Sequence, residues 1–254
     1  MHVVPLPALA DNYIWLLHDD DGQAVVVDPG EAAPVEAALS ARSLRLQAIL
    51  LTHHHGDHIA GAAALRERHG ATVYAPRDER IGAVDRQVGD GDVVTLDRPQ
   101  ARFEVLEVPG HTRSHIAYAG EGLLFCGDTL FSLGCGRLFE GTPAQMLASL
   151  ERLAALPGHL EVCCGHEYTE ANGRFARQVD PTNRALADRC IEAADARAQG
   201  RPTVPVPLAS ELACNPFLRI DSEALADWAG HRHAAGGRVE RFAALRAAKD
   251  VFQG

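Results

Sequence analysis

The sequence lacks the features of a membrane protein or a disulfide-stabilised protein. No apolar run approaches the ~20 residues that a membrane helix needs, because even LQAILLT ends in a histidine cluster. The first residues, MHVVPLPALADNY, lack a charged segment followed by a long apolar one, so we expect no signal peptide. No C-x-x-C motif occurs among the six cysteines, which argues against a thiolate zinc ribbon or a thioredoxin-like site. We therefore expect a cytoplasmic protein with no membrane partner.

Positive charge is also scarce. The chain of 254 residues has 24 Lys and Arg against 34 Asp and Glu, a formal net charge of −10, and Lys249 is its single lysine. A general nucleic-acid surface is therefore not expected, since such surfaces need excess positive charge. With 46% hydrophobic and 23% charged residues, the composition is typical of a folded globular protein with one large domain or two modest ones.

The apolar pattern predicts two domains that meet near residue 166. In the first part, short apolar stretches such as 24–27 and 46–52 end at turn residues, which predicts the strands of a mixed α/β domain. Helices are predicted over 58–69 and over 142–156. The rest of the chain is Ala- and Arg-rich with helical spacing. We expect a catalytic domain over 1–166 and a helical, substrate-binding domain over 167–254.

A dense set of metal ligands follows the predicted strand 46–52, in His53-His54-His55-Gly56-Asp57-His58. Zinc and related divalent ions prefer imidazole and carboxylate ligands. Side chains at i and i+2 of an extended segment point the same way, so His53 and His55 can bind one ion. Asp57 and His58 lie beyond the bend and can reach a second ion, while His54 points away into packing or an orienting hydrogen bond. An accidental histidine run or a tag is the alternative, but a tag would not follow a buried strand.

Three later residues repeat one pattern, in which an apolar strand is followed by Gly and then by His or Asp. They are His111 in VPGH, Asp128 in FCGD and His166 in CCGH. Taken singly, each is more often structural than a ligand. The repetition at three strand ends favours a shared metal site.

In this order, the seven ligand candidates resemble the metal-binding residues of the metallo-β-lactamase-fold hydrolases. The resemblance implies an α+β fold, an αββα sandwich followed by a smaller all-α C-terminal domain. It also implies two divalent metal ions, with zinc expected and iron or manganese as alternatives. One ion would be bound by His53, His55 and His111 and the other by Asp57, His58 and His166, with Asp128 bridging them.

Further segments are similar to one branch of that superfamily, the glyoxalase II or hydroxyacylglutathione hydrolase family: GDTLFSLGCGRLFEGT at 127–142, CGHEYT at 164–169, NPFLR at 215–219 and LRAAKD at 245–250. The resemblance implies hydrolysis of S-D-lactoylglutathione and related S-(2-hydroxyacyl)glutathiones to glutathione and a 2-hydroxy acid such as D-lactate, the second step of methylglyoxal detoxification. The expected nucleophile is a hydroxide that bridges the metals. Asp57 and Asp128 are the expected catalytic carboxylates, and Asp57 can also accept a proton from the nucleophile.

The resemblance also implies a binding site for the glutathione portion, formed by Arg137, Phe139, Tyr168, Arg246 and Lys249. Arg246 and Lys249 lie at i and i+3 of the last predicted helix, so we expect them on a face opposite to much of its apolar stripe. From composition alone, the alternative is a solvated helix end that complements the helix dipole. Some relatives have a lysine in place of Arg137 and a tyrosine in place of Phe139, which bears on glutathione affinity more than on the reaction.

Several readings compete with this one. A β-lactamase would more often be exported, a nuclease should carry a basic face, and a persulfide dioxygenase uses one iron with fewer ligands; a lactonase and a metal-storage protein without turnover are further alternatives. Asp28 resembles an aspartate that orients a histidine ligand, or it is simply a turn residue before Pro29. We expect a monomer whose only partner is the small-molecule thioester.

Overall fold

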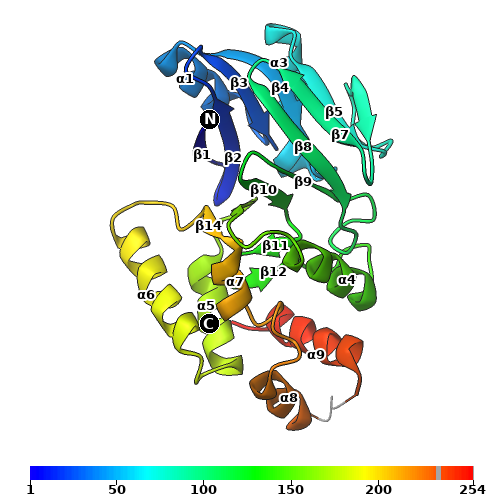
Figure 1. The fold of residues 1–254 in the computed structure, drawn as a ribbon, viewed down its shortest axis with the longest axis vertical. Coiled ribbons are helices and arrows are strands. Elements are labelled where there is room, and N and C mark those ends of the chain that lie inside the picture. Colours follow the sequence, from blue (N-terminus) through cyan, green and yellow to red (C-terminus); the bar gives the residue numbers. More distant parts are fainter. Residues whose placement is uncertain (233–235, 254) are drawn as a thin grey trace. The chain divides into compact units, whose positions relative to one another are not determined.

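In the computed structural model, which describes residues 1–232 and 236–253, the chain forms two compact units (Figure 1). The first unit comprises Met1–Glu107, Ser114–Gly127 and Gly165–Glu167, and the second comprises Val108–Arg113, Asp128–Cys164 and Tyr168–Gly254. The chain thus passes from one unit to the other several times, whereas the sequence predicts a single limit at residue 166. That limit stays a prediction.

The first unit contains a six-stranded sheet in the order β1-β2-β3-β4-β5-β6. Its strands are β1 (His2–Ala8), β2 (Asn12–His18), β3 (Gln23–Val27), β4 (Arg45–Leu50), β5 (Thr72–Pro76) and β6 (Arg86–Val88). The first three strands are antiparallel, and β3 to β6 are parallel. The carboxyl ends of the parallel strands therefore lie at one edge of the sheet. Because β2 is antiparallel to β3, β2 begins at the same edge.

Two stacked sheets and a helical layer make up this unit. Its other strands are neighbours in the order β10-β9-β8-β7: β7 (Val93–Asp97), β8 (Gln100–Glu107), β9 (Ile116–Gly120) and β10 (Leu123–Gly127). The rings of Trp15 and Phe125 pack between the sheets with centroids 6.4 Å apart. On the outer face of the first sheet, α1 (Ala32–Arg42) and α3 (Ala62–His69) bury Val35, Leu39 and Leu65 in one apolar core (Figure 1). The alternation of buried strands and helices predicted for this region is confirmed.

The prediction of a single helix over 58–69 is wrong, because this region contains two helices. α2 (Gly56–Ile59) ends before Gly61, and α3 begins after it. The Gly61 amide donates to the Pro29 carbonyl at 2.8 Å, and a Cβ at this position would clash with the backbone of Glu31 and Ala32. These contacts fix the backbone at Gly61, where one helix ends and the next begins. The metal-ligand segment is thereby placed on its own short turn of helix.

The second unit is mainly helical. It contains α4 (Pro143–Ala154), α5 (Thr169–Val179), α6 (Arg184–Ala198), α7 (Leu208–Cys214), α8 (Glu223–Gly230) and α9 (Arg238–Asp250), with the two-stranded hairpin β11 (Leu130–Phe131) and β12 (Gly134–Cys135) and the pair β13 (Glu161–Cys164) and β14 (Val206–Pro207). α4 confirms the helix predicted over 142–156, and Thr142 and Gln145 form its capping box. Among the described residues after Glu167, the only strand has two residues, so the predicted helical C-terminal region is also confirmed.

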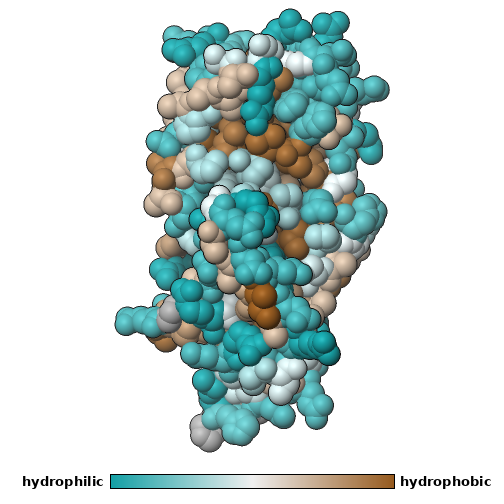
Figure 2. Space-filling model, turned by 90° about the vertical axis from the view of Figure 1, so that its left-hand side faces the viewer, coloured by the Kyte–Doolittle hydropathy of each residue, from teal (hydrophilic) through white to brown (hydrophobic). Residues whose placement is uncertain are grey.

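One face of the molecule is largely polar. Hydrophilic residues predominate on the face in Figure 2, with hydrophobic ones gathered mainly in its upper half. In the described part of the chain, no helix combines the length and apolar character needed to cross a membrane. All six cysteines are free thiols.

Candidate metal centre and substrate-binding residues

The metal-ligand loop begins at the edge where β3 and β4 end side by side. Val27 and Leu50 are paired in the parallel register, so Asp28 and Thr52 follow their strands at the same edge. The Thr52 amide and hydroxyl donate to the two carboxylate oxygens of Asp28, at 2.8 and 2.6 Å. Both residues are buried. This bidentate contact fixes the backbone immediately before His53.

Asp28 also orients the ligand histidines, which favours the orienting role over that of a simple turn residue. His58 donates through Nδ1 to Asp28 Oδ2 at 3.0 Å, which leaves its Nε2 for a metal. Because the Thr52 hydroxyl hydrogen is directed to Asp28, its oxygen accepts from His53 Nδ1 at 3.0 Å. Ligand atoms of Asp28, His53 and His58 also lie within 4.8 Å of one another, but the Asp28 carboxylate is engaged in these hydrogen bonds. It positions the histidines.

Asp57, His58 and His166 bring three ligand atoms together. His58 Nε2 and His166 Nε2 are 3.3 Å apart, and Asp57 Oδ2 lies 3.5 Å from the first and 3.4 Å from the second. Ligands bonded at ~2.0–2.1 Å to a tetrahedral zinc ion are about 3.3–3.4 Å from one another. The donor set of imidazole and carboxylate and its spacing therefore fit a divalent metal ion of this kind.

Two residues that sequence reasoning missed support this triad. His166 donates through Nδ1 to Asp11 Oδ1 at 2.8 Å, and the side-chain amide of Asn12 donates to Asp57 Oδ2 at 3.0 Å. Asp11 and Asn12 lie at the beginning of β2, which is antiparallel to β3 and therefore starts at the edge where β3 ends. No local signal marks them, since their partners lie 155 and 45 residues away in the sequence.

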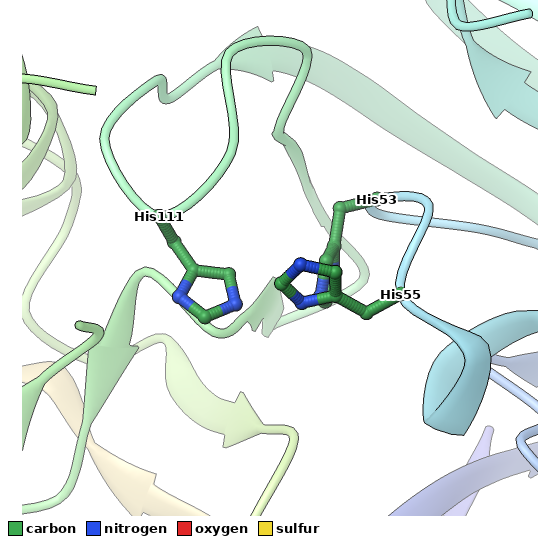
Figure 3. A group of neighbouring side chains, drawn as sticks. All are labelled: His53, His55 and His111. Carbon is green, nitrogen blue, oxygen red and sulfur yellow. The ribbon is translucent and has the colours of Figure 1, made fainter. Parts of the chain in front are cut away.

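A second group consists of His53, His55 and His111, whose ligand nitrogens lie within 4.8 Å of one another (Figure 3). His111 donates through Nδ1 to the Arg137 carbonyl at 2.8 Å, which leaves Nε2 as its ligand atom. That Nε2 lies 3.4 Å from Asp128 Oδ2, the same spacing as in the triad above. The structure thus groups the expected ligands in the two expected sets and places Asp128 beside His111.

His54 points away from these groups, as expected. Its Nδ1 lies 3.6 Å from Asp78 Oδ2, and both side chains are largely buried. Arg80 forms hydrogen bonds with both carboxylate oxygens of Asp78, and Ser114 donates to it as well. Hydrogen bonds from Arg80, followed by one from Ser114, hold the pKa of the Asp78 carboxyl well below its usual value despite its burial. Asp78 therefore stays ionised and lies beside His54, in the middle of the histidine segment.

The predicted orientation of Arg246 is wrong. Together with Phe242 and Leu245 it is buried in the second unit, whereas Val239 of the expected apolar stripe is 39% exposed. The Arg246 guanidinium donates to the Cys135 carbonyl at 2.6 Å, pairs with Asp250 at 3.1 Å and lies over the Phe217 ring. Helical spacing could not reveal this, because these partners include a carbonyl 111 residues away.

Arg137 and Lys249 remain closer to solvent in the same unit. Arg137 Nε lies 3.3 Å from Asp250 Oδ1, so Asp250, another residue that sequence reasoning missed, pairs with both Arg137 and Arg246. The ammonium of Lys249 lies near the rings of Phe175 and Phe252. Burial lowers the pKa of Lys249, and the neighbouring charges of Arg246, Arg174 and Arg137 lower it further. This neighbourhood is electropositive and favours a bound carboxylate.

Phe139 and Tyr168 supply exposed rings in that unit. They are 61% and 36% exposed, which is unusual for side chains of this size. Phe139 packs edge-on to the His111 imidazole with centroids 5.2 Å apart, and Tyr168 packs in the same way on Phe131. An exposed aromatic side chain such as Phe139, next to the candidate ligand His111, is suited to contact a small organic ligand.

The chain is similar to known proteins over its whole length. The profile described as "Metallo-beta-lactamase superfamily" matches residues 10–166, and "Hydroxyacylglutathione hydrolase C-terminus" matches residues 167–252. The hydroxyacylglutathione hydrolase of Xanthomonas campestris pv. campestris (strain B100) is 54% identical over 259 residues, with all of each chain covered.

Two solved structures share the fold. ETHE1 from Myxococcus xanthus has a TM-score of 0.67 and 28% identity, covering 98% of this chain and 97% of its own. TTHA1623, described in a di-iron-bound form, has a TM-score of 0.55 and 29% identity, covering 65% of this chain and 92% of its own. The predicted α+β fold is therefore confirmed, and a metal-dependent hydrolase is indicated. Full-length identity, and a C-terminal region that matches a dedicated profile, place this chain in the hydroxyacylglutathione hydrolase family of the metallo-β-lactamase superfamily.

Proposed function

We propose that this protein hydrolyses the thioester of S-D-lactoylglutathione and related S-(2-hydroxyacyl)glutathiones to glutathione and a 2-hydroxy acid. The observation that carries the proposal is the 54% identity to a hydroxyacylglutathione hydrolase over the whole chain, together with the grouped metal ligands. In a cell, this reaction would be the second step of methylglyoxal detoxification. The profile that matches residues 167–252 is described as the C-terminus of hydroxyacylglutathione hydrolases. This match favours such a hydrolase over a β-lactamase, a lactonase or a nuclease.

We propose that the protein binds two divalent metal ions, one through His53, His55 and His111 and one through Asp57, His58 and His166, whose donor atoms are grouped in these two sets. Asp128, whose Oδ2 lies 3.4 Å from His111 Nε2, would be the shared ligand. Zinc is our proposal for both, because four-coordinate imidazole and carboxylate sets suit it. Iron and manganese accept the same ligands. The di-iron form described for TTHA1623 supports the count of two ions in this fold.

When bound, the ions supply a water of lowered pKa and a counter-charge for the thioester oxygen. The chain's own residues fix where this happens. Hydrogen bonds from Asn12 hold Asp57, whose side chain is 39% exposed and can accept the proton of the attacking water. Attack at the thioester carbon breaks the C–S bond, and glutathione thiolate is a good leaving group, so no strong general acid is needed. Asp28 and Asp11 keep the ligand histidines in one tautomer throughout.

The glutathione portion is proposed to bind in the second unit, to Arg137, Phe139, Tyr168, Arg246 and Lys249. Glutathione carries two carboxylates, and the electropositive neighbourhood of Lys249 suits the glycine carboxylate. Arg246 is held by Cys135 and Asp250, so its role would be to raise the local potential and fix the helix end rather than to swing onto the ligand. Phe139 would contribute ring contacts and no hydroxyl.

Three further assignments belong to this proposal. Residues 1–166 would form the catalytic domain and 167–254 the substrate-binding domain, in line with the ranges that the two profiles match. The protein would act as a monomer in the cytoplasm. A reducing compartment suits its six free cysteines, none of which the proposed reaction uses.

The test is hydrolysis of S-D-lactoylglutathione by the zinc-loaded protein, by the protein after chelation, and after zinc is restored, with metal content measured in each sample. We expect activity that disappears on chelation and returns with about two zinc ions per chain. A nitrocefin assay and a lactone assay serve as matched controls for the alternative hydrolases. No thioester turnover by a fully loaded protein would refute the proposal.

A further inference from the structure

The hairpin that follows Asp128 is held by a buried carboxylate that the proposed mechanism does not use. Residues 128–137 run from Asp128 through β11 and β12 to Arg137, so this segment carries an expected metal ligand at one end and an expected glutathione ligand at the other. The hairpin tip is Ser132 and Leu133, and Leu133 has a φ of 60°, a conformation that leucine rarely adopts. An external contact is needed to hold such a tip.

Glu211 of α7 supplies that contact. Its side chain is 0% exposed. Its carboxylate accepts from the Ser132 hydroxyl at 2.7 Å, from the Leu133 amide at 2.8 Å and from the Asn215 side-chain amide at 3.0 Å. The Leu133 and Asn215 amides can only donate to this carboxylate, and the Ser132 hydroxyl, which already accepts from Arg189, donates to it as well. Burial raises the pKa of Glu211, and these hydrogen bonds oppose that shift.

The network around Glu211 holds the hairpin from several sides. Asn215 also donates to the carbonyls of Phe131 and Gly134, and Asn172 donates to the carbonyl of Ser132. Arg189, itself buried, donates to the Ser132 hydroxyl oxygen at 3.1 Å and to the Thr203 carbonyl at 2.7 Å. Residues from the helical part of this unit therefore bind the Ser132 hydroxyl and carbonyl, the Leu133 amide, and the carbonyls of Phe131 and Gly134.

The hairpin transmits this position to the ligand residues. The Gly136 amide donates to the Thr129 carbonyl at 3.1 Å, and a Cβ at Gly136 would clash with the Asp128 carbonyl, so the two ends of the hairpin are closely packed. One residue later, the Arg137 carbonyl accepts from His111 Nδ1. A displaced tip would therefore shift Asp128 at one end of the hairpin and Arg137 at the other. It would also break the hydrogen bond that fixes the tautomer of His111.

We propose that Glu211 is a positioning residue, which through Ser132 and Leu133 fixes the 128–137 hairpin so that Asp128 and Arg137 are set for metal binding and for glutathione binding together. The proposal rests on the function proposed above for Asp128 and Arg137. It predicts that a change at Glu211 affects metal affinity, kcat and KM, although the carboxylate touches neither metal nor substrate.

The test compares Glu211→Gln with Asp180→Asn. The Gln variant keeps the size of the side chain but removes its charge and turns an amide donor toward the Ser132 hydroxyl, which must then accept from that amide while it already accepts from Arg189. Asp180 is a matched control, because it is also a buried acid of this unit and accepts from Asn183, without contact to the hairpin. For each protein we would measure the melting temperature, the zinc affinity of the apoprotein, and kcat and KM for S-D-lactoylglutathione.

We expect Glu211→Gln to weaken zinc binding, lower kcat and raise KM, with kcat/KM falling about tenfold or more at temperatures where the variant is folded. Asp180→Asn should lower the melting temperature alone. Ser132→Ala, which removes one of the three donors, should cause the same changes on a smaller scale, and it decides the matter if Glu211→Gln does not fold. Unchanged zinc affinity, kcat and KM in a folded variant would overturn the proposal. An inactive wild type would instead refute the proposed function, while the zinc affinities would still test Glu211.

Discussion

The metal ligands of the first unit and the presumed glutathione ligands of the second are held in different ways. In the first unit, His58 and His166 each donate to a carboxylate, and His53 donates to a hydroxyl that is itself bonded to one. In the second, Arg137 and Phe139 are largely exposed. Geometry that must match a metal is fixed to a few tenths of an ångström, whereas affinity for a flexible peptide tolerates mobile contacts. We therefore expect substitutions of Arg137 and Phe139 to be tolerated better than substitutions of the ligand histidines.

The largest effect should come from removing a ligand. Asp57→Ala takes away a carboxylate that shares a site with two imidazoles, and we expect turnover to fall between about 10²- and 10⁴-fold. Zinc content should drop toward one ion per chain. Asp85→Ala is the control, because this acid pairs with Arg66 on the surface of the same unit. Full zinc content and wild-type rate in Asp57→Ala would remove its assigned role.

An orienting residue should matter almost as much. Asp28→Asn keeps the shape of the side chain but places an amide donor opposite the Thr52 and His58 donors, so we expect a loss of about 10- to 100-fold in zinc affinity or activity. Isothermal titration of the apoprotein with zinc measures it directly. If Asp28→Asn binds zinc as tightly as the wild type, the hydrogen bonds from the ligand histidines do not determine metal affinity. The contrast drawn between the two units would then be wrong.

The second unit should respond in KM alone. Lys249→Ala removes a charge from the proposed carboxylate site, and a charge-assisted hydrogen bond of about 1.5 kcal/mol corresponds to a roughly tenfold rise in KM with kcat unchanged. Steady-state kinetics with S-D-lactoylglutathione separates the two constants. A fall in kcat with constant KM would contradict the division of roles between the units.

The smallest effect concerns pH. Because the pKa of Lys249 is lowered, its ammonium is charged below that pKa and loses its charge as pH rises through it, earlier than an ordinary lysine would. We therefore expect the KM for the anionic thioester to rise a few-fold between about pH 7 and pH 10. Lys249→Arg, which stays charged over this range, should flatten the profile. An identical rise in both proteins would assign the titration to another group.

The sequence predicted most of the fold because the strands and helices have clear local patterns. It missed β1, where no strand was expected across Pro5 and Pro7, and the break at Gly61, which depends on contact with Pro29 and Glu31. Prolines weaken a strand pattern but are tolerated at a sheet edge, where β1 lies. Such features depend on tertiary neighbours that a local pattern does not contain.

The same limit applies to the candidate site, where only residues with a local sequence pattern could be predicted. The ligand candidates could be found because they follow apolar strands, either in the dense cluster at 53–58 or in the short repeated pattern of the later three. Asp11, Asn12 and Glu211 could not, because their partners are distant in the chain and the residues carry no motif of their own. The predicted orientation of Arg246 was wrong for a related reason, because a helix-face argument assumes that a charged side chain points to solvent. In the structure, a carbonyl and a carboxylate compensate the burial of its guanidinium.

The most direct measurement compares two thioesters of D-lactate with the zinc-loaded protein: S-D-lactoylglutathione, and the same acyl group on N-acetylcysteamine, which lacks the glutathione peptide. The account predicts a much higher kcat/KM for the glutathione thioester, with most of the difference in KM and with that preference reduced in Lys249→Ala. Equal kcat/KM values for the two substrates would contradict it, because the second unit would then contribute nothing to recognition.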